Sequence, residues 1–130
     1  MSLANMIARH PDVASEDFNE TLATAARHAV LCEAICSSCA DACVAEQMDI
    51  RQCVRKCLDC AEVCHATGRM ALRRTGENVE ALRLMLETCA RVCGLCADEC
   101  VRHDASHCKL CAEMCRECAA DCSRAIPTVQ

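Results

Sequence analysis

The chain has 130 residues, a formal net charge of −5, and seventeen cysteines against a single aromatic residue, Phe18. The negative charge and the lack of stacking aromatics argue against a nucleic-acid binder that neutralises phosphates. Three glycines and two prolines exclude a collagen-like chain and disfavour a turn-rich all-β fold. The length suits one compact domain.

Residues 1–14 are expected to form a separate N-terminal segment, which could include a short helix ending at His10-Pro11. The segment lacks the apolar core behind a basic start that a secretory signal has. No stretch of the chain approaches the roughly 18 uncharged apolar residues of a membrane span. The odd number of cysteines also prevents complete intramolecular disulfide pairing. We therefore expect a reduced, cytoplasmic protein that binds neither membranes nor nucleic acid.

The cysteines fall into four blocks with the spacing of an amphipathic helix, close to 3.6 residues per turn. In three blocks successive cysteines lie 4, 3 and 4 positions apart, and the fourth block alternates 3, 4, 3 and 4. A helix places all cysteines of such a block on one face, whereas a strand would scatter them over both faces. The blocks are Cys32, Cys36, Cys39, Cys43; Cys53, Cys57, Cys60, Cys64; Cys89, Cys93, Cys96, Cys100; and Cys108, Cys111, Cys115, Cys118, Cys122.

Four such blocks predict an all-α fold, namely an antiparallel up-down-up-down four-helix bundle over residues 15–127 with a cysteine-lined core. The connections between the blocks are short, so consecutive helices should be antiparallel. The helices are expected at about 15–46, 50–74, 77–102 and 105–125.

Capping residues support these limits. Ser15 is a candidate N-cap for the first helix, and Asp49 with Gln52 resembles a capping box before the second. Asp104 is a candidate cap for the fourth helix. A glycine suits the turn between the second and third helices, and a proline suits the end of the fourth; these are Gly76 and Pro127.

The two ends of the bundle should differ, because the apolar stripes continue past the cysteines in one direction only. At one end we expect an apolar plug formed by Phe18, Leu22, Ala25, Ala29, Thr67, Ala71, Val79, Leu82, Leu86 and Ile126. The opposite end collects potential soft and nitrogen ligands: Cys43, Cys53, Cys100 and Cys108 beside Met48, His103 and His107.

A thiol stripe on every helix exceeds what burial alone requires. Leucine or valine would bury more apolar surface and would carry no risk of oxidation. Two cysteines four positions apart on one helix cannot form a disulfide without breaking the helix, although pairs between helices remain conceivable. The pattern therefore favours metal binding or redox chemistry.

The charge of the bound thiolates favours Cu(I) as the metal. Metal-bound thiols are deprotonated, so full occupancy places up to seventeen negative charges in the core. Tetrahedral zinc takes four thiolates per dication and leaves about half of that charge uncompensated. A monovalent soft ion with bridging thiolates approaches one ion per cysteine and near neutrality. Helical i, i+4 positions, about 5–6 Å apart at Cβ, also suit a two-coordinate ion.

These four C-x3-C-x2-C-x3-C-type stripes resemble those of the bacterial copper storage proteins, specifically their cytosolic branch. The similarity covers the chain from about Ser15 to Pro127. It implies a four-helix bundle that holds many Cu(I) ions with its core cysteines, assembles as a homotetramer, and takes up copper at one end. Family members carry histidines near that end, which would match His103 or His107 here.

His103, His107 and Met48 are thus candidate residues for metal uptake, and all seventeen cysteines are candidate copper ligands. The remaining histidines, His28 and His65 among them, are expected to face outward. We expect a storage protein and not an enzyme, with copper ions as its partners and an unidentified donor or acceptor protein. Two alternatives remain open at this point: a zinc-binding or metallothionein-like buffer, and a thiol-redox protein.

Overall fold

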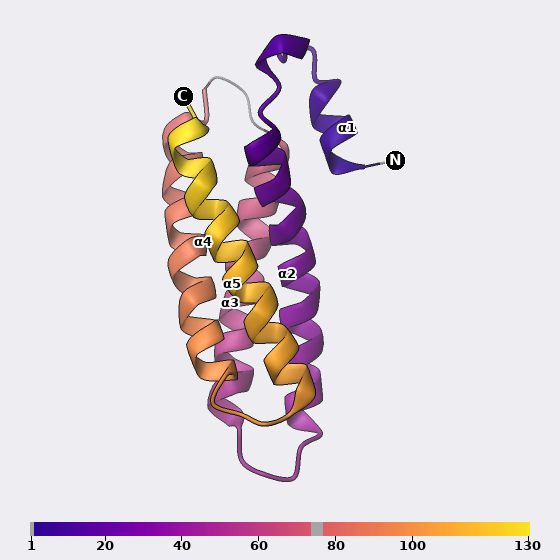
Figure 1. The fold of residues 1–130 in the computed structure, drawn as a ribbon, viewed down its shortest axis with the longest axis vertical. Helices are drawn as coiled ribbons and strands as arrows, with labels where there is room; N and C mark the ends of the chain where they lie inside the picture. Colours follow the sequence, from indigo (N-terminus) through magenta and orange to yellow (C-terminus); the bar gives the residue numbers. More distant parts are fainter. Residues whose placement is uncertain (1, 74–76) are drawn as a thin grey trace.

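The computed structural model describes residues 2–73 and 77–130, and these ranges contain helices and no strand. Four long helices run antiparallel: α2 (Glu20–Val44), α3 (Arg51–Leu72), α4 (Val79–Cys100) and α5 (Ser106–Ala125) (Figure 1). The predicted all-α, up-down-up-down four-helix bundle is confirmed.

Neighbouring helices in the sequence are also neighbours in space. Contacts link α2 to α3, α3 to α4, α4 to α5, and α5 back to α2, so that the four helices enclose one central core. The α2–α3 and α4–α5 loops lie together at the lower end in Figure 1. The short helix α1 (Leu3–Ala8) packs on α2 at the other end, where the C-terminus also lies.

The first long helix begins later than the sequence predicts. Ser15 lies in a 3-10 turn, Ser15–Asp17, and Phe18 adopts an extended conformation that separates this turn from α2. Asn19 is the actual cap, and its side chain accepts a hydrogen bond from the Leu22 amide at 2.9 Å. The predicted cap at Ser15 is therefore wrong, because a second good capping residue, Asn19, stands three positions before the first core-facing leucine, Leu22.

The other predicted caps also differ. Asp49 accepts a hydrogen bond from the Arg51 amide at 3.2 Å, but Ile50 holds the N-cap position of α3 without a side-chain bond among the described residues. Ala105, and not Asp104, is the N-cap residue of α5. Gly76 lies outside the described residues. Pro127 follows the end of α5, within the 3-10 turn Ile126–Thr128.

The end of the bundle opposite the α2–α3 loop is an apolar plug. Leu22, Leu82 and Leu86 are fully buried there, and the core extends along the C-terminal tail to the buried Val129. Arg83 donates to the Val129 carbonyl and holds this tail on α4. Phe18 precedes α2 and is only half-buried, so it contributes less to the plug than predicted.

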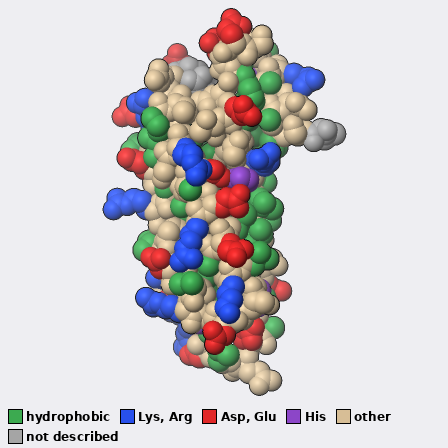
Figure 2. All heavy atoms as spheres, viewed as in Figure 1, with side chains coloured by type: hydrophobic (Ala, Val, Ile, Leu, Met, Phe, Trp, Pro, Cys, Tyr) green, Lys and Arg blue, Asp and Glu red, His purple; other side chains and the backbone are tan. Residues whose placement is uncertain are grey.

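The outside of the bundle is mixed in character. Figure 2 shows acidic and basic side chains interspersed along one face, with hydrophobic side chains between them. The larger exposed apolar residues on the four long helices include Leu31, Leu58, Leu84, Leu95 and Leu110. Among the described residues, no helix combines the length and hydropathy that crossing a membrane requires.

Candidate metal site

All seventeen cysteines point into the core. Each is at most 3 % exposed, and each is a free thiol. The helical spacing has the predicted consequence, since one thiol stripe from each of α2, α3, α4 and α5 faces the axis. The interhelical disulfides that the sequence left conceivable are absent from these seventeen residues.

The sulfur atoms are in contact across the bundle. The Sγ atoms of Cys36 on α2 and Cys115 on α5 lie 3.5 Å apart, and those of Cys53 on α3 and Cys100 on α4 lie 3.6 Å apart. Contacts along one helix are nearly as close, with 3.8 Å between the Sγ atoms of Cys32 and Cys36. The core is therefore a continuous column of sulfur.

The thiols form overlapping groups of four that could each hold a metal ion. Within each group all ligand atoms lie within 4.8 Å of one another. Cys115 belongs to at least two groups, and so do Cys32, Cys36, Cys39 and Cys111. The all-cysteine groups include Cys32, Cys64, Cys93, Cys118; Cys32, Cys36, Cys60, Cys115; Cys36, Cys96, Cys111, Cys115; and Cys39, Cys57, Cys100, Cys111.

Several thiols belong to more than one group of four, and this sharing indicates which metal ion the column can bind. Separate tetrahedral zinc sites each need four thiolates of their own. Here a thiol such as Cys115 serves neighbouring groups, which suits soft monovalent ions joined by bridging thiolates. The arrangement can thus bind a chain of ions along the axis.

At the end of the column beside the two lower loops lies His107, one of the three candidate residues for metal uptake. His107 Nδ1 lies 3.4 Å from Cys39 Sγ and 3.6 Å from Cys108 Sγ. Cys43 completes a group of four potential ligands with these residues. The side chain of His107 is 27 % exposed, so this group connects the buried column with solvent. We refer to Cys39, Cys43, His107 and Cys108 as the mouth.

The protonation of the mouth is set by its surroundings. Burial raises the pKa of Cys43 and of Cys108 to about 12. A hydrogen bond from the Cys100 thiol is the main influence that lowers the pKa of Cys39 to about 6. The pKa of His107 is raised, first by its hydrogen bond with Cys39 and then by that with Glu46. Cys39 is therefore the thiol that ionises most readily in this group.

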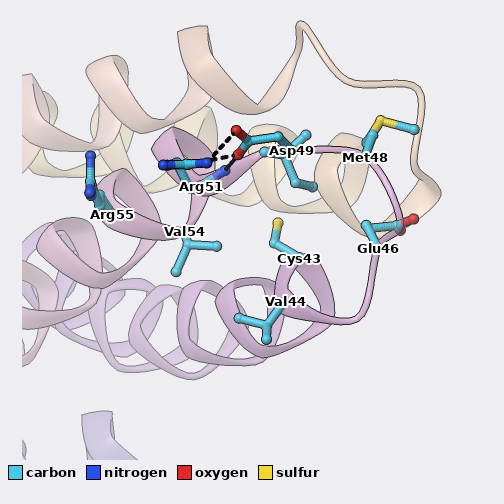
Figure 3. A pocket seen from close by; sticks show the side chains of 9 residues that line it. Cys43, Val44, Glu46, Met48, Asp49, Arg51, Val54 and Arg55 are labelled. Carbon is cyan, nitrogen blue, oxygen red and sulfur yellow. Dashed lines mark hydrogen bonds and ion pairs between the residues drawn. The ribbon is translucent and has the colours of Figure 1, made fainter.

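The structure separates the other two uptake candidates from the mouth thiols. His103 Nε2 pairs with the buried carboxylate of Glu99 at 3.0 Å and, like His107, lies near the loop ends. Met48 is 62 % exposed on the α2–α3 loop, where it lines a solvent-open hollow of about 320 Å³ together with Cys43. Figure 3 shows the Met48 thioether directed away from Cys43.

Three buried or half-buried acidic residues were not anticipated from the sequence. Glu46 contacts His107 Nε2 at 2.8 Å, and Glu99 contacts His103. Asp121 binds His28 at the seam between α2 and α5, so His28 is not directed outward as expected. His65 is half-exposed and pairs with Glu33. No sequence signal identifies Glu46 or Asp121, because their partners lie 61 and 93 positions away.

The sequence model for copper storage proteins matches residues 18–127. Among solved structures, the chain is similar to the copper storage protein Ccsp from Streptomyces lividans loaded with 10 copper equivalents. The two are 35 % identical, with a TM-score of 0.91, over 97 % of this chain and 98 % of that chain.

Two further relatives extend the comparison. A structure of a cytosolic copper storage protein from Streptomyces lividans with five coppers is 39 % identical in sequence to this chain, with a TM-score of 0.80. That match covers 83 % of this chain and 93 % of the other. The cysteine-rich protein YhjQ of Bacillus subtilis, described as uncharacterised, is 30 % identical over 82 residues, which are 62 % of this chain and 72 % of YhjQ.

Proposed function

Since this chain belongs to the copper storage protein family, we propose that it stores many Cu(I) ions along the axis of its bundle. The observation that carries the proposal is the column of seventeen buried, free thiols, which form overlapping groups of four. All seventeen cysteines are proposed as copper ligands. The solved relatives described as copper storage proteins support copper as the cargo.

Cu(I) neutralises the negative charge of the buried thiolates more completely than a divalent ion does. Unpaired buried charge is costly, so the thiolates must be neutralised inside the core. One monovalent ion per thiolate achieves this if each thiolate bridges two ions, and the shared membership of Cys36 and Cys115 permits bridging. Soft thiolate ligands also select Cu(I).

The metal-free protein is expected to be folded already. Protonated cysteines pack as small apolar residues, and the plug around Leu82 and Leu86 holds the four helices together without metal. Each incoming ion then displaces protons from its thiols, so copper affinity should weaken as pH falls. The chain binds and releases copper without a chemical turnover.

Copper uptake is proposed to occur at the mouth. His107 is the nitrogen ligand there, since its Nδ1 atom faces Cys39 and Cys108 and its ring is partly exposed. Met48 and His103 are assigned to the approach, where Met48 lines the hollow above Cys43. Neutral imidazole and thioether groups both suit copper.

The cellular setting is proposed from the relatives and from the molecular surface. A cytoplasmic location agrees with the cytosolic Streptomyces lividans relative and with the free thiols. A homotetramer is proposed from the family resemblance, and the exposed apolar residues Leu31, Leu58 and Leu95 offer contact surface for it. The protein that delivers or receives the copper is unknown.

Anaerobic titration of the reduced protein with Cu(I) tests this function. We expect saturation near one equivalent per cysteine with little change in helicity by circular dichroism. Saturation near four equivalents, or folding only when metal is added, would refute the proposal. A parallel competition between Zn(II) and Cu(I) tests the zinc-buffer alternative, and a peroxide turnover assay tests the thiol-redox alternative.

A further inference from the structure

We propose that Glu46 is a positioning residue for copper uptake, because it holds the His107 ring with its Nδ1 lone pair directed at the mouth thiols. The inference rests on the proposed function of the mouth. It concerns a residue outside the cysteine stripes, on the loop that follows α2.

The geometry places His107 between a carboxylate and two thiols. Its Nε2 atom lies 2.8 Å from Glu46 Oε1, while its Nδ1 atom lies 3.4 Å from Cys39 Sγ and 3.6 Å from Cys108 Sγ. Glu46 and His107 are 61 positions apart, and both side chains are about two-thirds buried, at 31 % and 27 % exposure. The contact therefore joins the α2–α3 loop to the start of α5 across the mouth.

The chemistry of the two partners fixes the tautomer. An ionised carboxylate can only accept hydrogen bonds, and its contact with Nε2, at 2.8 Å, is shorter than the contact of Nδ1 with Cys39 Sγ, at 3.4 Å. Nε2 of a neutral His107 therefore carries the proton even when the Cys39 thiol is ionised. Nδ1 then has the free lone pair, and this is the atom that faces Cys39 and Cys108. Carboxylates commonly orient metal-binding histidines in this way, and their loss typically weakens metal binding about 10–100-fold.

The other histidine–carboxylate pairs of the described chain do not have this arrangement. His103 pairs with Glu99 and His65 with Glu33. Among the described residues, no thiol lies within hydrogen-bond distance of the second nitrogen of either ring. His28 faces carboxylates with both nitrogens, from Asp121 and Glu117. An oriented lone pair beside thiols is specific to His107, which is why Glu46 is assigned a role in uptake.

The first measurement is made on the reduced, metal-free, full-length protein. Long-range proton–nitrogen spectra of the histidine rings report the tautomer, at a pH where the same spectra show His107 to be neutral. We expect an unprotonated Nδ1 in the wild type and in Glu46→Gln, whose amide oxygen still accepts from Nε2–H. Glu46→Ala should give a mixture of tautomers. An unchanged tautomer in Glu46→Ala would overturn the proposal, whatever the protein's copper capacity.

The second measurement is the anaerobic uptake of the first Cu(I) equivalent at the same pH. We expect about a tenfold loss of affinity or rate in Glu46→Ala, a much smaller loss in Glu46→Gln, and unchanged total capacity in both. Asp49→Ala is the matched control, since it removes a carboxylate of the same loop that pairs with Arg51. Equal losses of Cu(I) uptake in Asp49→Ala and Glu46→Ala would overturn the proposal, because they would show that any negative charge on this loop promotes uptake.

A double substitution separates positioning from a direct role of the carboxylate. If Glu46 acts through the ring, Glu46→Ala should have no further effect on uptake in a His107→Ala background. A full additional loss in that background would show that Glu46 acts independently of His107 and would overturn the proposal. Failure of the wild type to store copper would instead refute the proposed function, and the tautomer spectra would still decide the positioning of His107.

Discussion

The Sγ atoms of Cys36 and Cys115 lie 3.5 Å apart, although the two residues are separated by 79 positions in the chain. Cys115 Sγ also lies 3.8 Å from that of Cys32 and 3.9 Å from that of Cys60. One thiol on α5 thus contacts thiols of α2 and α3 at the same level of the bundle. A thiolate at this position is placed to bridge several copper ions.

Replacing Cys115 by alanine should therefore remove more than one copper ion from the saturated protein. The loss follows because a bridging thiolate is shared between neighbouring ions, and both then lack a ligand. Anaerobic titration with Cu(I) measures the stoichiometry. Cys43→Ala is a suitable comparison, since the Cys43 Sγ atom lies at the mouth, 3.8 Å from that of Cys108. This substitution should reduce the copper capacity by less than Cys115→Ala does. A loss of one ion or fewer from Cys115→Ala would argue against bridging.

Removal of the imidazole at the mouth should slow copper uptake. We expect His107→Ala to reduce the rate of binding of the first Cu(I) equivalents about tenfold while leaving the final capacity unchanged. His103→Ala should have a smaller effect, because its ring contacts Glu99 and not the mouth thiols. Stopped-flow measurement under anaerobic conditions gives both rates. Equal rates for His107→Ala and the wild type would exclude a role of this ring in uptake.

The metal-free protein should lose stability in alkaline solution. Burial raises the pKa of Cys43 and Cys108 to about 12 and that of Cys53 to about 11, from an ordinary value of 9.0. Between pH 9.0 and these values the unfolded chain binds fewer protons than the folded one, so stability falls as pH rises. Below that window the contribution of these three thiols is fully present.

Thiols with a lowered pKa do not reverse this trend. Cys39, with a pKa of about 6, is largely ionised in both states once the pH exceeds its ordinary value of 9.0, so it adds no further change there. Thermal unfolding of the reduced protein, followed by circular dichroism across the alkaline range, measures the effect. The copper-loaded protein serves as the control, because its thiols are already deprotonated. A metal-free protein of constant stability across this range would contradict the raised pKa values.

The sequence predicted the bundle and its lining well, because both depend on one periodic signal. Seventeen cysteines at helical spacing fix which face of each helix is inward, and burial of all seventeen follows. The start of the first long helix was predicted poorly, since Ser15 and Asn19 are both good caps and only packing selects between them. The partners of His28 and His107 depend on contacts between distant segments, and local spacing carries no information about them.

The apolar plug should determine stability without affecting copper capacity. Leu82 is fully buried at the end of the bundle opposite the mouth, and its replacement by alanine should cost about 2–5 kcal/mol of unfolding free energy. Leu84 on the same helix is 58 % exposed, so Leu84→Ala should change the unfolding free energy by less than about 0.5 kcal/mol. Urea unfolding of the reduced proteins gives both values. A drop in copper stoichiometry with Leu82→Ala would show that the plug and the thiol column are not independent.

The two helical glycines should respond differently to replacement by alanine. A Cβ atom at Gly94 on α4 meets nothing within 4 Å, so Gly94→Ala should gain up to about 1 kcal/mol from its better helix propensity. A Cβ atom at Gly68 on α3 would lie 3.1 Å from Val30 Cγ2 and 3.6 Å from the Ala26 carbonyl oxygen, where α2 and α3 approach closely.

Gly68→Ala should therefore gain less stability than Gly94→Ala. Val30 must move away from the added Cβ atom, and the free-energy cost of that movement offsets the gain in helix propensity. Val30 is branched at Cβ and stiff, so it can yield only by a small shift of α2 against α3. Urea unfolding of Gly68→Ala in wild-type and Val30→Ala backgrounds isolates this contact. The full gain in stability should appear only when Val30 is shortened. Equal gains for Gly68→Ala and Gly94→Ala in the wild-type background would mean that the α2–α3 interface is less tightly packed than the distances indicate.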